Sequence, residues 1–445
     1  MRIHFVGIGG IGMSSLALHC KISGNDVYGS DIYDNEQTEI LKKVGIHVFI
    51  GHDYDNWLNP DLVVHTPAVH SDNPEIIRAR RENVKVVSRS EFLRQILDGM
   101  TQFAVTGSDG KTTTTAMIAH CLKTFGEDPT VFLGGVHRSL EFGNYRSGKG
   151  PIVYELDESQ PEFSSFCPDY LIITNARGDH LENYNNDEKF YRSCFEELSS
   201  KTRRIVITFA DDKNTSHLGD YTFGKTHGTC KLVNRVVKDL YQVATIGLDG
   251  KQYQLILRLP GEHNVLNAMA VLTLFWAAGY DPNKVLEALR DFVSTRRRFD
   301  ITILNKEQKT YVVDDYAHTP DEIKSLLAAA EEIFPEQKKI VIFQPHRYSR
   351  LLREDGNFAK ALKDADEIYV TEVYSAFEKI IPQLSARVIV EGLENYGKKA
   401  TYFPKLEDLL NAFHPQENTV YLFVGAGDII KISQKFVENY KKGDH

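Results

Sequence analysis

Two glycine-rich loops, each placed between an apolar run and a helical stretch, constrain the fold of this chain more than any other feature. The first lies in "RIHFVGIGGIGMS" and spells G-x-G-x-x-G through Gly7, Gly9 and Gly12, with Gly10 between them. The second lies in "QFAVTGSDGKTTTT", which begins at residue 102. A glycine loop that opens a helix offers backbone N–H groups and the positive end of the helix dipole to a phosphate. The pattern predicts two βα units, each with a phosphate-binding loop.

Short apolar runs alternate with helical stretches along the rest of the chain as well. Such a βα succession predicts the α/β fold class with parallel, doubly wound sheets. Because 445 residues exceed what one hydrophobic core organises, we predict three domains in series. They are a Rossmann-like domain over 1–98, a central P-loop-like domain over 99–296 and a C-terminal Rossmann-like domain over 297–445. Among the predicted strands are 3–8, 26–31, 47–51, 62–67, 84–89, 151–156, 170–175, 203–209, 339–345, 367–373 and 400–404, and a β-rich patch spans about 218–258.

Composition excludes several classes of protein. The net charge of −9 argues against a nucleic-acid partner, because non-specific binding to a polyanion depends on basic patches. No apolar window is long enough to span a membrane, and Met1 leads directly into a strand without a signal peptide. The odd number of scattered cysteines indicates neither a disulfide framework nor a zinc site. We therefore expect a cytoplasmic protein with no membrane partner.

The first loop has the context of a dinucleotide-binding unit. Asp31 ends the run "DVYGSD", nineteen residues after Gly12, where an acidic side chain can accept a ribose hydroxyl. What such a loop recognises is the diphosphate. The residues alone leave open an NAD enzyme, another pyrophosphate ligand, or a glycine turn that binds nothing.

The second loop is not a strict Walker A motif, because position 105 is valine. What remains is G-x-x-G-K-T, in which Gly107 and Gly110 free backbone N–H groups, Lys111 supplies a cation and Thr112 offers a hydroxyl to magnesium. A triphosphate with a divalent ion needs hard oxygen ligands. Glu155 ends an apolar run, and Asp179 and His180 follow another, so these side chains are candidate metal ligands at the carboxyl edge of the sheet.

The ordered set of motifs resembles the Mur ligases over essentially the whole chain. It comprises the two loops, "ELDES", "NARGDH", "GEHNVLNA", "RRRF", "DDYAHTP", "FQPHRYSR" and "VGAGDI". Within that family the chain is most similar to the members that join L-alanine to UDP-N-acetylmuramate. The resemblance implies that the first loop holds the diphosphate of a UDP-sugar and the second holds ATP with Mg²⁺ or Mn²⁺. It also implies an ADP-forming ligation through an acyl phosphate in peptidoglycan synthesis.

The resemblance assigns roles to individual residues. The UDP-sugar is implied to bind at Gly7, Gly9, Gly10, Gly12 and Asp31, and ATP at Gly107, Ser108, Asp109, Gly110, Lys111, Thr112, Thr113, His263, Asn264, Asn267, Arg298 and Asp315. Implied metal ligands are Thr112, Glu155 and His180. Implied catalytic residues are Lys111, Glu155, His180, His318, Arg347 and Arg350, with His318 as a candidate general base.

The chain departs from the family pattern at several places. The ATP loop usually reads G-T-H-G-K-T, so Asp109 adds a carboxylate beside the phosphates, and Thr319 replaces a second histidine in "DDYAHTP". The lysine that other family members carbamylate has no counterpart at the expected distance after His180. These departures affect substrate choice and metal geometry more than the class of reaction.

Three alternative functions differ in which features they explain. A ligase that joins a preformed peptide to UDP-N-acetylmuramate shares most of these motifs. An NAD-dependent oxidoreductase would use the first loop and leave "GSDGKT" without a role. A non-catalytic UDP-sugar sensor would not need Lys111, Glu155 and His180.

Overall fold

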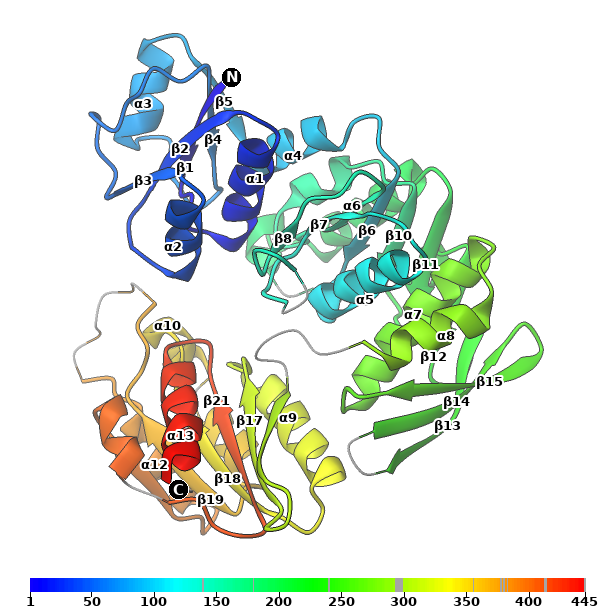
Figure 1. Cartoon of the computed structure of the whole chain (residues 1–445), viewed down its shortest axis with the longest axis vertical. Helices are drawn as coiled ribbons and strands as arrows, with labels where there is room; N and C mark the ends of the chain where they lie inside the picture. The colour runs from blue at the N-terminus through cyan, green and yellow to red at the C-terminus, as the bar shows by residue number, and fades with distance from the viewer. Residues whose placement is uncertain are drawn as a thin grey trace. The chain divides into compact units, whose positions relative to one another are not determined.

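The computed structural model describes residues 1–137, 140–178, 180–238, 241–292, 299–354, 356–376, 378, 381, 383–411 and 414–443. These residues form two compact units, which are described separately (Figure 1). The first comprises Met1–Arg235, Ala244–Ile256 and His263–Phe292, and the remaining described residues form the second.

The first unit begins with a parallel sheet of five strands in the order β3-β2-β1-β4-β5. This is a doubly wound order, with the chain reversing direction across the sheet between β1 and β4. The strands are β1 (Arg2–Val6), β2 (Asp26–Asp31), β3 (His47–Ile50), β4 (Leu62–His65) and β5 (Lys85–Ser88). The helices are α1 (Ile11–Ile22), α2 (Glu36–Lys43), α3 (Pro74–Arg81) and α4 (Arg89–Leu97).

A second sheet follows, in the order β15-β14-β13-β12-β11-β10-β6-β9-β7-β8. Its central strand β6 is buried along its whole length, as expected of a parallel strand covered on both faces. The strands are β6 (Gln102–Thr106), β7 (Thr130–Phe132), β8 (Tyr145–Arg146), β9 (Ile152–Glu155), β10 (Tyr170–Ile173), β11 (Ile205–Phe209), β12 (Tyr221–Gly224), β13 (Cys230–Lys238), β14 (Tyr241–Leu248) and β15 (Lys251–Leu257). The helices are α5 (Lys111–Thr124), α6 (Glu188–Lys201), α7 (Glu262–Ala277) and α8 (Pro282–Arg290), with short 3₁₀ helices η1 (Pro161–Ser165), η2 (Leu181–Tyr184) and η3 (Ser216–Leu218).

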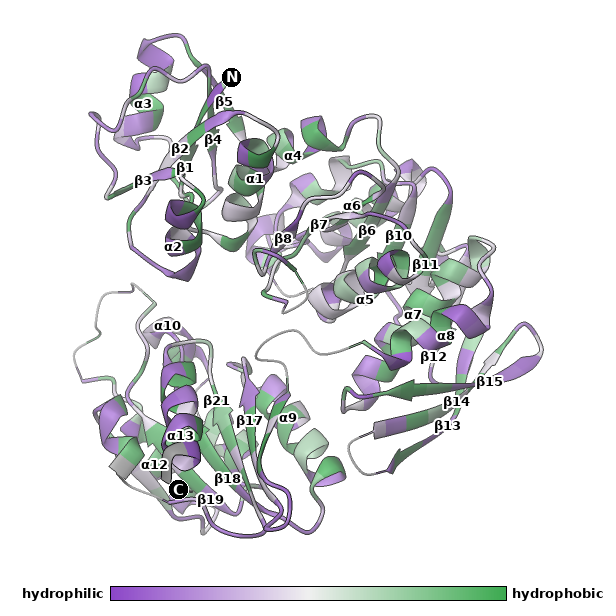
Figure 2. Ribbon diagram, viewed as in Figure 1, coloured by the Kyte–Doolittle hydropathy of each residue, from purple (hydrophilic) through white to green (hydrophobic). Residues whose placement is uncertain are grey.

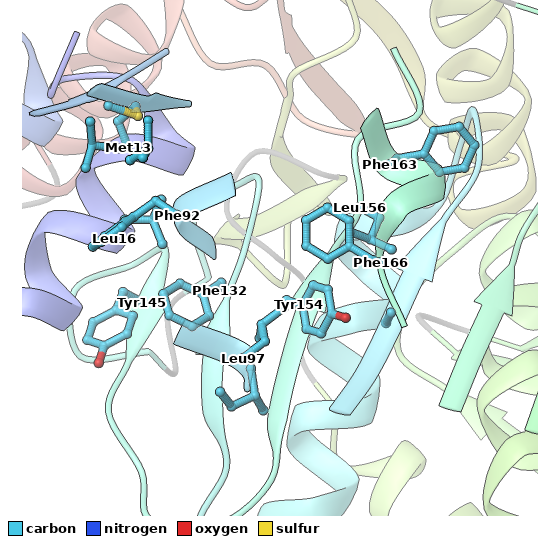
Figure 3. Packing of buried hydrophobic residues seen from close by; sticks show 14 of the residues in the cluster. Met13, Leu16, Phe92, Leu97, Phe132, Tyr145, Tyr154, Leu156, Phe163 and Phe166 are labelled. Carbon is cyan, nitrogen blue, oxygen red and sulfur yellow. The ribbon is translucent and has the colours of Figure 1, made fainter. Parts of the chain in front are cut away.

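One hydrophobic cluster joins the first two sheets. Side chains of α1 and α4, such as Leu16 and Phe92, belong to the same buried cluster as Phe132 and Tyr145 of the second sheet (Figure 3). Polar contacts cross the same region, where Asn144 Nδ2 donates to the Ile11 carbonyl at 2.7 Å. This packing fixes the start of α1 relative to the second sheet.

The second unit contains a sheet in the order β16-β17-β21-β18-β19-β20. Its strands are β16 (Asp300–Asn305), β17 (Thr310–Asp315), β18 (Lys338–Phe343), β19 (Glu367–Thr371), β20 (Ala400–Phe403) and β21 (Thr419–Val424). Its helices are α9 (Pro320–Ile333), α10 (Tyr348–Arg353), α11 (Asn357–Leu362), α12 (Arg387–Glu394) and α13 (Ile429–Gly443), with η4 (Leu406–Asn411). Central strands such as β18 and β21 are hydrophobic, whereas α13 has a hydrophilic face (Figure 2).

The three-domain α/β architecture predicted from the sequence is confirmed. Sequence reasoning missed β7, β8 and β16, which are short or lie at a sheet edge, and β16 pairs antiparallel with β17. The strands of the three sheets fall within 2–88, 102–257 and 300–424. The domain ranges 1–98, 99–296 and 297–445 stay predictions, and the boundary at 296/297 lies outside the described residues.

Candidate active site

The first glycine loop is held in place by the acid that the sequence singled out. Gly10 precedes the first turn of α1, and Gly7 has a φ of +83°. Asp31, at the end of β2, accepts a hydrogen bond from the Gly9 N–H at 2.7 Å through Oδ2. A Cβ atom at Gly9 would lie 2.9 Å from that same Oδ2. Asp31 therefore positions the loop, and a ribose contact by its carboxylate stays a prediction.

Both glycine loops open into one cavity of about 440 Å³ in the first unit. Gly10 and Gly12 line it from the first loop, and Lys111 and Thr112 from the second. Thr66 and Pro67, which follow β4, also line it, so the cavity reaches the crevice where the first sheet reverses its strand order. The cavity is large enough for a small-molecule ligand.

Arg89, at the start of α4, brings a positive charge to this cavity. It lines the cavity beside Gly12, where any Cβ atom would overlap the Arg89 guanidinium. Its Nη2 atom lies 3.6 Å from Oδ2 of Asp157. Burial by itself would raise the pKa of Asp157, but hydrogen bonding by Ser159 and the charge of Arg89 hold that pKa below its ordinary value.

The second loop leaves no room for side chains at its two glycines. At Gly107, with a φ of +125°, a Cβ atom would overlap Thr174 Oγ1 and lie 2.6 Å from the Asn175 carbonyl oxygen. At Gly110 it would lie 2.6 Å from Oδ1 of Asn267. Both positions also have left-handed backbone, which glycine adopts at the lowest cost.

Lys111 and Thr112 both contact carboxylates. Nζ of Lys111 donates to Oε2 of Glu158 at 2.7 Å and to the Gly107 carbonyl at 2.5 Å. Glu158 is buried, and burial raises its pKa against the opposing effect of Lys111. Thr112 Oγ1 donates to Oε2 of Glu155 at 3.0 Å, and Oε1 of Glu155 accepts from the Gly134 N–H at 2.6 Å. The predicted contact of Lys111 with a phosphate would require it to release Glu158.

Asp109, the unusual residue of the second loop, forms an ion pair. Its Oδ2 atom lies 2.5 Å from Nη2 of Arg177, and both side chains are about half exposed. Ser108 accepts the Arg177 N–H through Oγ at 3.0 Å. The carboxylate that replaces the family's usual histidine is thus neutralised by an arginine from "NARGDH".

Thr112 and Glu155 line the cavity of the glycine loops, and His180 is not among its lining residues. Its exposed imidazole Nδ1 is 3.6 Å from Oε1 of Glu182, and its backbone has a φ of +88°. Within the described ranges, no three side chains of His, Cys, Asp or Glu gather in a way that could hold a metal ion. Asp179 lies outside the described residues. The role of His180 as a third metal ligand stays a prediction.

Helices α5 and α7 carry four more of the residues assigned to ATP. Thr113 is buried in α5, and Asn264 and Asn267 are buried on α7. His263, on the first turn of α7, is exposed. Arg298 lies outside the described residues, so its assignment is not addressed by the structure.

The carboxyl edge of the sheet in the second unit gathers a cationic cluster. His318 follows β17, and His346, Arg347 and Arg350 follow β18; these strands both pair with β21. The His318 and His346 rings lie 5.8 Å apart, and Nη1 of Arg350 lies 3.2 Å from Nδ1 of His346. Burial, followed by the charges of His318, Arg350 and Arg347, lowers the pKa of His346 to about 4. The cluster therefore suits an anionic ligand.

Two details of this cluster point to function. Arg347 has a φ of +72°, a conformation that is costly for a residue with a side chain. Nε of Arg350 is buried without a hydrogen-bond partner among the described residues, and burial lowers the pKa of this guanidinium.

Asp315, which the resemblance assigns to ATP, holds the backbone in place. Its carboxylate accepts hydrogen bonds from the N–H groups of Phe299 and Ala317 at 2.7 Å each.

Thr319, the other departure from the family pattern, caps helix α9. Its side chain and that of Glu322 form a capping box, in which each accepts a backbone N–H of the other residue. The sequence "TPDE" carries this signal. A structural role therefore accounts for threonine at this position.

Sequence reasoning missed four titratable residues that the structure places near these groups: Arg89, Glu158, Arg177 and His346. Glu158, Arg177 and His346 lie inside motifs that were noticed for other residues. Arg89 is the last residue of the predicted strand 84–89, and its position at a carboxyl edge was the signal available for it.

No helix among the described residues is long and apolar enough to cross a membrane.

Comparisons with known proteins follow the same three-part division. Residues 2–101 match the catalytic domain of the Mur ligase family, residues 105–275 the Mur ligase middle domain, and residues 297–427 the Mur ligase glutamate ligase domain. A UDP-N-acetylmuramate–L-alanine ligase of Pseudothermotoga lettingae is 68% identical over 99% of this chain and 100% of its own. The crystal structure of the UDP-N-acetylmuramate–alanine ligase of Thermotoga maritima has a TM-score of 0.91 at 54% identity, with complete coverage of both chains. A murein peptide ligase of Psychrobacter arcticus shares the fold, with a TM-score of 0.67 at 21% identity over 99% of this chain and 98% of its own.

Proposed function

This chain belongs to the Mur ligase family, and from that premise we propose that it joins L-alanine to the carboxylate of UDP-N-acetylmuramate at the expense of ATP. ADP and phosphate are the other products, and the amide is a precursor of peptidoglycan. The single observation that carries this proposal is the cavity lined by both glycine loops. It explains why one chain has two phosphate-binding loops, because the reaction brings a nucleotide-linked acid to ATP.

The reaction needs activation, since a carboxylate and an amine do not form an amide readily in water. A carboxylate oxygen attacks the γ-phosphorus, the bond to the leaving ADP oxygen breaks, and an acyl phosphate forms. The amine nitrogen then attacks the acyl carbon, phosphate leaves, and the nitrogen loses a proton. Catalysis of such a transfer rests mainly on positioning and on stabilising charge.

Lys111 supplies this stabilisation from the second loop. It reaches the γ-phosphate when it releases Glu158, and the raised pKa of Glu158 lowers the cost of leaving that buried carboxyl without its partner. Arg89 is suited to the anionic part of the UDP-sugar, because it lines the cavity beside Gly12.

The oxygen donors of Thr112 and Glu155 fit magnesium, which prefers hydroxyl, carboxylate and phosphate oxygens. We assign these two side chains to the ion, with His180 as the third expected ligand. A divalent ion bound there neutralises the charge of the ATP phosphates. Manganese accepts nitrogen ligands more readily than magnesium.

In the second unit, Arg347 and Arg350 are suited to the carboxylate of L-alanine, and His318 to the proton of its amine. The buried Nε of Arg350 provides a donor that a carboxylate can satisfy. His318 already lies near a carboxylate, with Nδ1 3.1 Å from Oε2 of Glu322.

Phosphate release from ATP tests the proposed reaction. We expect release only with both UDP-N-acetylmuramate and L-alanine. The preformed-peptide alternative predicts release when a tripeptide replaces L-alanine.

A thermal-shift measurement tests the first loop separately. UDP-N-acetylmuramate at one hundred times its dissociation constant stabilises the protein by about 2.7 kcal/mol, whereas NAD and NADP leave the melting temperature unchanged. A shift with NAD alone would favour the oxidoreductase. The cytoplasmic location stays a prediction.

A further inference from the structure

A second cavity, of about 350 Å³, runs along helix α5 in the first unit. We call it the α5 cavity. Its volume falls in the range of small-molecule sites. Its apolar lining comes from α5 and from the chain that leads into and out of β7, and these residues are mostly buried: Ala116, Ala119, Pro129, Val131, Leu133 and Leu140.

Basic side chains complete the lining of the α5 cavity. Lys123 and Arg146 carry fixed positive charges, and His120 contributes an imidazole whose pKa is lowered by burial. None of the described residues that line the cavity is acidic. Both terminal nitrogens of Arg146 are engaged, since Nη2 donates to Oδ1 of Asp128, outside the cavity, at 2.6 Å and Nη1 donates to the Pro129 carbonyl at 2.5 Å. Within the described residues Lys123 has no ion-pair partner. The cavity thus combines an apolar wall with an excess of positive charge.

We propose that the α5 cavity binds a small hydrophobic carboxylate at a site separate from the two glycine loops. The apolar wall takes the body of the molecule, and Lys123 takes its carboxylate. The ligand needs both parts, because a simple inorganic anion would leave the apolar wall in contact with water, and a neutral hydrocarbon would leave Lys123 without a counter-charge.

One residue gives this site a physical connection to the nucleotide loop. Leu133 lines both the α5 cavity and the cavity shared by the glycine loops. The next residue, Gly134, donates its N–H to Glu155, and a Cβ atom at Gly135 would lie 2.9 Å from Cγ2 of Thr112. A ligand that displaces Leu133 therefore acts on the segment that packs against Thr112 and Glu155.

Titration calorimetry with naphthalene-1-carboxylate tests the proposal, with naphthalene-1-carboxamide as its neutral counterpart. We expect one molecule of the carboxylate to bind per chain, about tenfold or more tightly than the carboxamide, because a charge-assisted hydrogen bond is stronger than a neutral one. Equal affinity of the two probes, or no binding of the carboxylate, would overturn the proposal.

Three variants locate the bound probe. Ala119→Leu fills the cavity and should abolish binding, and Lys123→Gln should remove most of the preference for the carboxylate. Lys149→Gln, an exposed lysine that does not line the cavity, should bind like the parent. Because Ala119→Leu adds volume to a buried position, its melting temperature is measured first to show that the variant is folded. Lys123→Gln changes an exposed side chain, so it tests the site even if Ala119→Leu does not fold. Unchanged binding in both Ala119→Leu and Lys123→Gln would refute the site.

Competition with Mg-ATP separates the two cavities. For a distinct site, the affinity of the probe is either unaffected by ATP or changes to a plateau as ATP saturates. An affinity that keeps falling in proportion to the ATP concentration would place the probe in the cavity of the glycine loops and would overturn the proposal.

Discussion

The two glycine loops share a backbone design and differ in how charge is arranged around them. Among the described residues, the acid in contact with the first loop is Asp31, which binds the Gly9 N–H, and the nearby cation Arg89 comes from the start of α4. In the second, Lys111 and Asp109 belong to the loop and its helix, and each binds an opposite charge from elsewhere in the unit. The first loop can therefore accept a diphosphate with its contacts intact, whereas the proposed binding of ATP at the second loop requires an exchange of ion pairs.

This difference fits the proposed chemistry of the two ligands. The diphosphate of a UDP-sugar is not transformed, so backbone N–H groups and one external cation are enough to hold it. The γ-phosphate of ATP is transferred, and charge that builds up during transfer needs a mobile cation close by. Changes in the two loops should therefore affect different quantities.

Lys111→Ala is the strongest test of the contrast. We expect the ligation rate to fall more than about a hundredfold, because the transition state loses about 3 kcal/mol of stabilisation. Binding of UDP-N-acetylmuramate should stay intact. Steady-state kinetics and a thermal shift with the sugar nucleotide measure the two effects. Lys284→Ala, an exposed lysine on α8, is the matched control. Near-parental turnover in Lys111→Ala would remove the second loop from the mechanism.

Gly107→Ala and Gly12→Ala compare the rigidity of the two loops. At Gly107 the new methyl group meets the Asn175 backbone and the residue keeps a φ of +125°, so unfolding free energy should fall by about 2 kcal/mol or more. At Gly12 it meets only the end of the Arg89 side chain, which can move, so the loss should stay below about 1 kcal/mol. Urea denaturation measures both values. Equal losses would show that the first loop is as tightly enclosed as the second.

Glu155→Gln and His180→Ala test the metal assignment of the second loop. Glu155→Gln should raise the magnesium concentration for half-maximal rate about tenfold or more, because a carboxylate ligand becomes a neutral amide. If His180 also binds the metal, His180→Ala raises this concentration too, and manganese supports a higher parental rate than magnesium. Turnover lost at unchanged metal demand would instead assign His180 to orienting a water or the sugar carboxylate.

Asp109→His restores the usual family loop and should have the smallest effect. The Asp109–Arg177 pair is half exposed, and such pairs contribute about 1 kcal/mol or less to stability. We expect the magnesium concentration for half-maximal rate to be unchanged in Asp109→His. Asp109→His should change the melting temperature of the parent but not that of the Arg177→Gln variant. A shifted metal requirement would show that Asp109 recruits a cation.

Much of the fold was predictable because parallel strands that are covered on both faces appear as continuous apolar runs. The runs at 170–175, 203–209 and 339–345 correspond to β10, β11 and β18. β8, with two residues, and the edge strand β16 lack that signal. The two loops were predictable for a similar reason, since glycine, strand and helix adjoin in the sequence.

The sequence by itself determined the βα units, both glycine loops and the motifs that identify the family, because each depends on residues a few positions apart. Only the tertiary structure decided that the two loops line one cavity and which charges meet there. Arg89 reaches Gly12, Glu158 reaches Lys111, and Arg177 reaches Asp109. The two residues of each pair lie 47 or more positions apart in the sequence. Such contacts depend on strand order and on the packing of α1 and α4 against the second sheet, and local sequence patterns carry no record of either.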